Sequence, residues 1–142
     1  MTGSGFTKLL TEELVRMPWK NGGGMTTELA KGGQGSGDQS WTWRVSMADV
    51  ASDGPFSIFT GIDRSIAVIE GDGMDLHYPD GRKTGLDLNK VVNFDGGDSI
   101  EGKLRNGAIK DINVMADRRY FKAILEIASG PIEIEKSTLA GS

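Results

Sequence analysis

Hydrophobic and polar residues alternate with a period of two along much of the chain, which is typical of β-strands with one buried face. In residues 41–50, WTWRVSMADV, the tryptophans share one face with Val45, and Arg44 shares the other with Ser46. This segment therefore predicts a strand with two chemically different faces.

Five further segments continue the strand pattern, and most are bounded by glycine-rich or Pro-Asp-Gly turn signals. They are residues 64–71, 74–88, 90–104, 109–115 and 120–136. We expect the first to be a buried strand and the second a hairpin. Short strands without intervening helices predict an all-β sandwich or barrel, because a sheet with one apolar face must close on itself or pack on another sheet.

Two segments depart from this pattern. Residues 9–17, LLTEELVRM, are compatible with one or two helical turns, although Pro18 biases Met17 toward an extended conformation. Residues 31–40, KGGQGSGDQS, have the composition of a linker and are expected to form a mobile loop between two strands.

The 142 residues are enough for one core, so we expect a single domain over residues 1–142.

Composition limits the classes of function. The chain has no cysteine, which excludes disulfides, zinc-thiolate sites and cysteine nucleophiles. Sixteen Lys and Arg against 20 Asp and Glu give a net charge of −4 without a basic stripe, so no nucleic-acid partner is expected. No apolar run approaches the roughly 18 residues of a membrane span, and the N-terminus lacks the core of a signal peptide. We therefore expect a cytoplasmic protein without a membrane partner.

Three consecutive glycines, residues 22–24, follow Trp19 and Asn21 in the segment PWKNGGGMTTEL. The segment lacks the Gly-Lys-Ser/Thr ending of a phosphate-binding loop, so nucleotide binding is not expected. Glycines, Gly23 at their centre, let the chain turn tightly into the next strand. Asn21 and Glu28 are then expected to point toward a pocket mouth. The alternative is a bulge and turn at a barrel rim.

Arginines provide the clearest candidate chemistry. Arg44 interrupts an apolar strand, and Ser46 points to the same side, so both line a pocket if either does. Arg64 begins the buried strand. A guanidinium in a concave site is a natural bidentate partner of a carboxylate. The alternative for Arg64 is an internal ion pair, for example with Asp63 or Asp53.

Histidine chemistry is not expected, because His77 is the single histidine and shares its face with Asp75 beside a turn. A metal that prefers imidazole needs several converging ligands, and a catalytic triad needs an imidazole, so we expect no metal and no cofactor. Five carboxylates remain as candidate bases or as turn residues. They are Glu28, Asp53, Asp63, Glu70 and Asp111.

The aromatic residues and Asn113 each allow two interpretations. Phe56, like the neighbouring Phe59 and the tryptophans, could stack on a planar ligand or fill the core. In residues 111–115, DINVM, Asn113 lines the interior if Ile112 and Val114 pack outside, or the reverse. The alternation by itself leaves both arrangements open.

Several motifs together resemble the HutD/Ves family of RmlC-like cupins. They are PWKNGGGMTTEL, WTWRVSMADVASDGPFSIFTGIDRSIAVIEGDGMDL, and KDINVM followed by Arg118 or Arg119, and they run from about residue 17 to residue 119. The resemblance implies a cupin (jelly-roll) barrel and a link to histidine utilisation or stress response, without an assigned reaction. Family members usually continue further, so we expect a C-terminally shortened barrel that forms a homodimer.

Three functions follow as expectations. The first is metal-independent binding of a small carboxylate metabolite in the barrel, for which the resemblance suggests urocanate or formiminoglutamate. The second is a metal-independent isomerase or hydrolase that uses a carboxylate with Arg44. The third is an oligomeric interaction module with a filled barrel. The expected ligand-binding residues are Trp19, Asn21, Gly23, Glu28, Arg44, Ser46, Asp53, Phe56, Arg64 and Asn113.

Overall fold

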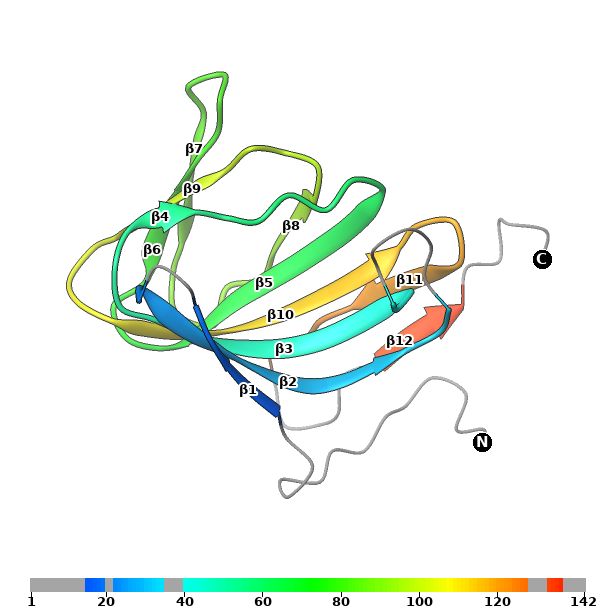
Figure 1. Cartoon of the computed structure of the whole chain (residues 1–142). Coiled ribbons are helices and arrows are strands. Elements are labelled where there is room, and N and C mark those ends of the chain that lie inside the picture. The colour runs from blue at the N-terminus through cyan, green and yellow to red at the C-terminus, as the bar shows by residue number, and fades with distance from the viewer. Residues whose placement is uncertain (1–14, 20–21, 35–39, 128–132, 137–142) are drawn as a thin grey trace.

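The computed structural model describes residues 15–19, 22–34, 40–127 and 133–136, and this part of the chain is built of β-strands without a helix (Figure 1). The larger sheet contains, in spatial order, β1 (Val15–Pro18), β2 (Gly24–Gly32), β3 (Trp43–Val50), β10 (Ile109–Asp117), β5 (Ile62–Glu70) and β8 (Val92–Asp95). All neighbouring pairs in it are antiparallel.

A second sheet faces the inner side of the first. Its order is β4 (Gly54–Pro55), β9 (Glu101–Leu104), β6 (Met74–His77) and β7 (Lys83–Leu86). A small third sheet pairs β11 (Phe121–Ile124) with β12 (Glu133–Lys136). The all-β prediction is confirmed.

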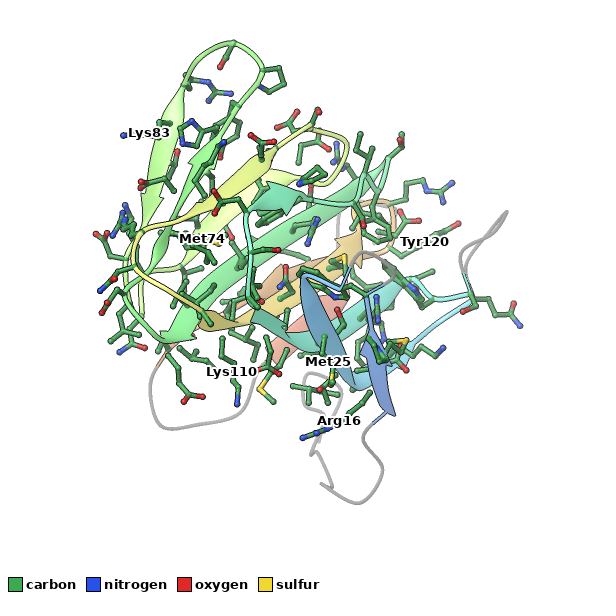
Figure 2. The ribbon with its side chains drawn as sticks, turned by 60° about the vertical axis from the view of Figure 1, so that its left-hand side comes forward. Arg16, Met25, Met74, Lys83, Lys110 and Tyr120 are labelled. Atoms are coloured by element: carbon green, nitrogen blue, oxygen red, sulfur yellow. The ribbon has the colours of Figure 1, made fainter. Side chains whose placement is uncertain are left out.

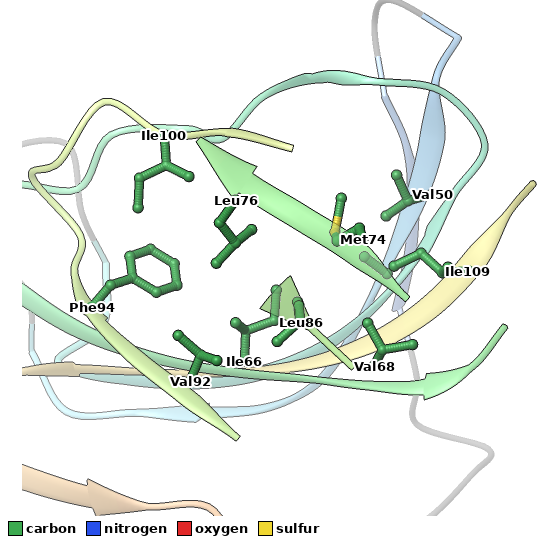
Figure 3. Packing of buried hydrophobic residues seen from close by; sticks show 11 residues of the cluster. Val50, Ile66, Val68, Met74, Leu76, Leu86, Val92, Phe94, Ile100 and Ile109 are labelled. Carbon is green, nitrogen blue, oxygen red and sulfur yellow. The ribbon is translucent and has the colours of Figure 1, made fainter. Parts of the chain in front are cut away.

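The main core lies between the two larger sheets (Figure 3). Ile66 and Val68 project from β5 toward Leu76 of β6 and Leu86 of β7, and all four side chains are fully buried. Burying one such aliphatic side chain contributes about 1.5–3 kcal/mol. The apolar phase of each strand therefore drives the two sheets together.

The outer face of the larger sheet is also covered. Val45, Ala67 and Val114 form a second apolar cluster with Leu125, against which Phe121 of β11 packs. The central strands β3, β10 and β5 are thus covered on both faces. In residues 41–50, one face carries the tryptophans and Val45, and the other carries Arg44 and Ser46. Both faces are therefore largely shielded from bulk water.

Most sequence predictions of elements are confirmed. Residues 64–71 lie largely in the buried strand β5, and residues 74–88 form the β6–β7 hairpin, whose turn is closed by the Tyr78 N–H donating to the Arg82 carbonyl. The possible helix at residues 9–17 is wrong for its described end, because Val15–Pro18 pairs with β2 as a strand. The rest of that segment lies outside the described residues. The loop expected over residues 31–40 is wrong at its start, because Lys31 and Gly32 pair with β3 as the end of β2, and its residues 35–39 lie outside the described residues.

The described residues contain no helix with the length and apolar character of a membrane span. The expected cytoplasmic location stays a prediction.

Leu76 tests the main core. Leu76→Ala should lower the free energy of unfolding by about 2–5 kcal/mol, because its fully buried side chain would leave a cavity. Leu88, which is 50% exposed, is the matched control, and Leu88→Ala should change stability by less than about 0.5 kcal/mol. Urea denaturation followed by tryptophan fluorescence measures both, and equal losses would contradict the core assignment.

The glycine run tests the β1–β2 turn. Gly22 has a φ of 75°, and a Cβ on Gly24 would collide with the Asp49 carbonyl oxygen and the Trp19 ring. Gly24→Ala should therefore destabilise the protein by more than the about 1 kcal/mol typical of point mutations. Gly54→Ala, where an added Cβ meets nothing within 4 Å, should be close to neutral in the same denaturation experiment. A neutral Gly24→Ala would show that no close approach requires this glycine.

Candidate functional site

A cavity of about 370 Å³ opens at one end of the inner face of the larger sheet. The central strands supply its floor, the segment 52–57 supplies one wall, and Met74 of β6, which is labelled in Figure 2, also lines it. Its lining residues are Trp19, Thr26, Arg44, Ser46, Ala48, Val50, Ser52, Asp53, Gly54, Pro55, Phe56, Ser57, Phe59, Arg64, Met74, Asp111, Asn113 and Met115.

Strand register brings the polar residues together. Met115 of β10 is paired with Arg44 on β3 and with Arg64 on β5, so the two arginines flank it on one face. Asn113 is paired with Ser46, and Asp111 follows on the same phase of β10. Two guanidinium groups, a hydroxyl, an amide and a carboxyl therefore share one cavity.

Arg64 is 7% exposed and lies deep in this site. Its Nη2 donates to Asn113 Oδ1 at 2.9 Å, and its Nη1 donates to the Ser57 carbonyl at 3.2 Å. Its guanidinium carbon lies 5.5 Å from the Phe56 ring centroid and 5.0 Å from that of Phe94. Burial lowers the pKa of Arg64 to about 10, so the side chain stays charged near neutral pH.

One nitrogen of the Arg64 guanidinium makes no hydrogen bond within the part of the chain that the structure describes. Its Nε is buried and has no hydrogen-bond partner among the described residues. A buried donor without a partner costs about 1–3 kcal/mol, so such an atom needs an explanation. Because this atom has almost no accessible surface, a molecule in the cavity does not reach it, and the cost belongs to the burial of Arg64 itself.

Asp111 is 2% exposed, and its Oδ1 accepts a hydrogen bond from Asn113 Nδ2 at 2.6 Å. Burial raises the pKa of Asp111 to about 7, while the charge of Arg64 opposes this rise. Asn113 thus bridges a guanidinium and a carboxyl that titrates near neutrality. The first of the two arrangements left open by the sequence is the right one, since Ile112 and Val114 pack on the outer face.

Arg44 is held by Glu28 of β2, whose Oε1 accepts from Arg44 Nε at 3.1 Å. A bulge in β2 follows Glu28, and the two side chains are 15% and 18% exposed. Glu28 is not among the lining residues of the cavity, so the structure assigns it the positioning of Arg44. As expected from the alternation, Arg44 and Ser46 both line the cavity.

The glycine run places Trp19 in the cavity wall. Trp19 Nε1 donates to Thr26 Oγ1 at 2.7 Å, and the Gly22 N–H donates to the Trp19 carbonyl at 3.1 Å. Gly23 is buried, and its carbonyl accepts from the Ala51 N–H at 2.8 Å, outside the cavity lining. Asn21 lies outside the described residues.

Asp53 and Asp63 do not pair with Arg64, so that alternative is wrong. Asp53 Oδ1 accepts from the Leu104 N–H at 2.7 Å while the residue lines the cavity mouth. Asp63 forms an ion pair with Arg118 at 3.1 Å. Arg64 instead donates to Asn113, which is 49 positions away in the sequence, and to the carbonyl of Ser57, which is seven positions away.

Sequence reasoning included Asp111 among the candidate bases but did not place it at the site. Its period-two spacing from Asn113 was the signal that would have joined them. Thr26, Ser57 and Met115 were missed, because they lie within the quoted motifs but nothing in the sequence distinguishes their side chains as cavity-lining. Of the aromatic residues, Phe56 and Phe59 line the cavity, whereas Trp41 and Trp43 pack in apolar clusters.

The site does not fit the usual metal set of cupins. His77 shares with Asp75 the outward phase of β6 and does not line the cavity. Among the described residues, no group of three His, Cys, Asp or Glu side chains converges to hold a metal ion. No step through a metal is therefore derived for this site.

Two facing antiparallel sheets with a polar cavity between them define a cupin-type protein. The fold resembles the Cupin_2 domain of an XRE family transcriptional regulator from Enterobacter cloacae, with a TM-score of 0.52 over 66% of this chain and 96% of that one. At 13% identity, this likeness concerns the fold alone.

The chain belongs to the HutD family, whose family model matches residues 11–140. It is 36% identical over 129 residues to an uncharacterised 21.2 kDa protein in the hutC 3′ region of Pseudomonas putida, covering 91% of this chain and 67% of that protein. Protein Ves of Citrobacter koseri is 30% identical over 120 residues, 82% of this chain and 62% of its own length.

A solved structure extends this relationship. HutD from Pseudomonas fluorescens SBW25 has a TM-score of 0.74 and 36% identity, over 82% of this chain and 62% of that one. The resemblance seen in the sequence motifs is therefore confirmed. The chain spans about two thirds of the length of these relatives.

The titration of Asp111 predicts a pH effect on stability. Its pKa is raised from 3.8 to about 7 in the folded protein, so between these values the folded state binds more protons than the unfolded chain. The contribution of Asp111 to stability is therefore present at low pH and lost as pH rises toward 7. Asp111→Asn is neutral throughout and removes this slope.

Urea denaturation of both proteins at several pH values tests this. The free energy of unfolding of the wild type should fall relative to Asp111→Asn by up to about 4 kcal/mol between about pH 4 and pH 7.5. Other carboxylates cancel in the difference between the two proteins. Parallel curves would mean that Asp111 is ionised in the folded state across this range.

Proposed function

We propose that this protein binds a small carboxylate-bearing metabolite, without a metal, in the cavity between its two larger sheets. The observation that carries the proposal is that Arg44 and Arg64 line the same cavity, where Arg64 is bonded to an amide and a backbone carbonyl and forms no direct ion pair with a described carboxylate. A carboxylate satisfies a guanidinium with two parallel hydrogen bonds.

The size and charge of the cavity support this proposal. Its volume of about 370 Å³ falls in the range of about 300–1,000 Å³ that small-molecule sites occupy. Glu28 offsets the charge of Arg44, whereas Asp111, the carboxyl whose charge acts on Arg64, has a pKa raised to about 7 by burial. The positive charge of Arg64 is therefore only partly neutralised, which favours an anionic ligand.

The relatives suggest which acids to test. One is encoded in the hutC 3′ region of Pseudomonas putida and another is named HutD, so acids of histidine utilisation such as urocanate and formiminoglutamate are candidate ligands. The homodimer, the cytoplasmic location and the absence of a nucleic-acid partner stay predictions.

A second candidate is a metal-independent isomerase or hydrolase. The observation favouring it is that Asp111, whose pKa is about 7, lines the same cavity as the two arginines. A general base works best when its pKa lies near the working pH. Incubating each acid that binds with the protein, and following it by NMR, separates turnover from binding. The third candidate, a module with a filled barrel, requires a packed interior, and the cavity argues against it.

Thermal unfolding against a panel of small carboxylates tests the binding proposal. The panel includes urocanate, formylated and formiminated glutamate, and sugar acids. A ligand at 100 times its Kd adds about 2.7 kcal/mol and should raise Tm by several degrees. Arg44→Ala should abolish the shift, because it removes a cavity guanidinium. Arg82→Ala, at an exposed turn, is the matched control and should leave the shift unchanged. A flat panel with folded protein would contradict the proposal.

A further inference from the structure

We propose that Asp111 binds the ligand as a neutral carboxylic acid. Its Oδ2–H donates a hydrogen bond to the same carboxylate that the cavity arginines bind, so binding near neutral pH takes up a proton. This inference rests on the proposed function and deepens it, because it adds a donor and a proton linkage to the same anion site. The arginines by themselves predict carboxylate binding without proton uptake.

A chain of hydrogen bonds places Asp111 beside Arg64. Arg64 Nη2 donates to Asn113 Oδ1 at 2.9 Å, and Asn113 Nδ2 donates to Asp111 Oδ1 at 2.6 Å. The first bond fixes the orientation of the amide, so its N–H group faces Asp111. When the carboxyl of Asp111 is neutral, Oδ1 remains the acceptor and the proton is therefore carried by Oδ2.

The Oδ2 atom of Asp111 is accessible from the cavity. It forms no hydrogen bond with the described residues. Among those residues, Arg64 Nε is the one fully buried side-chain nitrogen or oxygen without a hydrogen-bond partner, so Asp111 Oδ2 retains accessible surface. Because Asp111 is only 2% exposed and lines the cavity, that surface faces the cavity. A neutral Asp111 thus offers a free O–H donor there.

The two arginines keep donors for the same anion. Arg44 donates to the described residues only through Nε, to Glu28, so its two terminal nitrogens are free. Each terminal nitrogen of Arg64 donates one hydrogen bond and carries two N–H groups. Burial lowers the pKa of Arg64 to about 10; Asp111 opposes this change, and the charge of Arg44 adds to it. The two guanidinium groups therefore repel each other, and a shared anion relieves the repulsion.

A carboxylate bound by the arginines changes the balance of charge at Asp111. Burial raises the pKa of Asp111 to about 7; Arg64 of β5 and the hydrogen bond from Asn113 oppose this rise, and Asp49 of β3 adds to it. A bound anion offsets the positive charge that favours the ionised carboxyl and adds a negative charge beside it. Both changes favour the neutral acid, because a like charge nearby disfavours ionisation.

Few other groups of the cavity lining carry charge. They are Arg44 of β3 and Asp53 at the cavity mouth. The second sheet contributes only uncharged residues to the lining, namely Gly54, Pro55 and Met74. The proton linkage is therefore assigned to Asp111, and its O–H···O⁻ bond to the ligand belongs to the strong class of charge-assisted hydrogen bonds.

Isothermal titration calorimetry of the unmodified protein tests the inference. The probes are formylated glutamate and gluconate, whose carboxyl groups are ionised between pH 6 and pH 8 because ordinary carboxyl pKa values lie near 4. Titrations at pH 7 in buffers of different ionisation enthalpy should show uptake of about half a proton per probe bound, since a group with a pKa near 7 starts half protonated. The association constant should fall about tenfold from pH 6 to pH 8.

Asp111→Asn separates the proton linkage from structural support. In this variant the amide oxygen takes the place of Oδ1, and the amide N–H group takes the place of the Oδ2–H donor. Binding should therefore remain, whereas the proton uptake and the pH dependence of the association constant should disappear. Asp63→Asn, whose side chain is 59% exposed and outside the cavity lining, is the matched control and should retain both.

The outcomes separate this inference from the proposed function. If a probe binds without proton uptake and with the same affinity at pH 6 and pH 8, carboxylate binding stands and the role of Asp111 is overturned. Proton release on binding would equally overturn it, because Asp111 would then be ionised in the complex. Proton uptake that persists in Asp111→Asn would assign the proton to another group. If neither probe binds at millimolar concentration, both the inference and the carboxylate proposal fail.

Discussion

Coverage of three central strands on both faces determines how the rest of the molecule is built. The outer faces of β3, β10 and β5 pack against the apolar cluster that includes Leu125, and their inner faces turn toward the second sheet. Polar side chains on such strands cannot reach bulk water, so each needs an internal partner or a cavity. Such a cavity adjoins the apolar core on the inner face, and Ser46, Arg64 and Asn113 line it.

Within that cavity, burial opposes charge at two groups. Loss of hydration disfavours the charged forms of both Arg64 and Asp111, and it moves their pKa values to about 10 and about 7. Asn113 lies between them, accepting from the guanidinium and donating to the carboxyl. The side-chain amide of Asn113 holds both groups in position, and the two groups form no direct ion pair with each other. The site therefore holds a guanidinium and a carboxyl side by side in one cavity, joined through an amide.

As a member of the HutD family, this protein has its cavity in a cupin-type fold, an architecture shared by proteins of different functions. Cupin-like neighbours share the two-sheet architecture at low identity, and a shared fold does not carry a shared reaction. The donor set distinguishes this cavity from metal-binding relatives of the fold. The single histidine of the chain, His77, lies on the outward-facing side of β6 and outside the cavity. The described lining consists mainly of arginine, amide, hydroxyl and aromatic groups. Function here is best argued from those groups.

The sequence by itself determined most of the strands, and the resemblance of its motifs identified the family. Period-two alternation placed Arg44 and Ser46 on one face correctly, because side-chain direction in a strand is a local property. Motif spacing was sufficient to identify a cupin-type chain. The same local rule left Asn113 undecided between two faces, since both faces of its strand are covered.

Only the tertiary structure decided which residues meet. Arg64 and Asn113 are 49 positions apart, and their hydrogen bond depends on the pairing of β5 with β10. The raised pKa of Asp111 likewise needs burial by several strands, which no local pattern encodes. Strand propensity is fixed by neighbours in the chain, whereas partners, burial and electrostatics are fixed by neighbours in space.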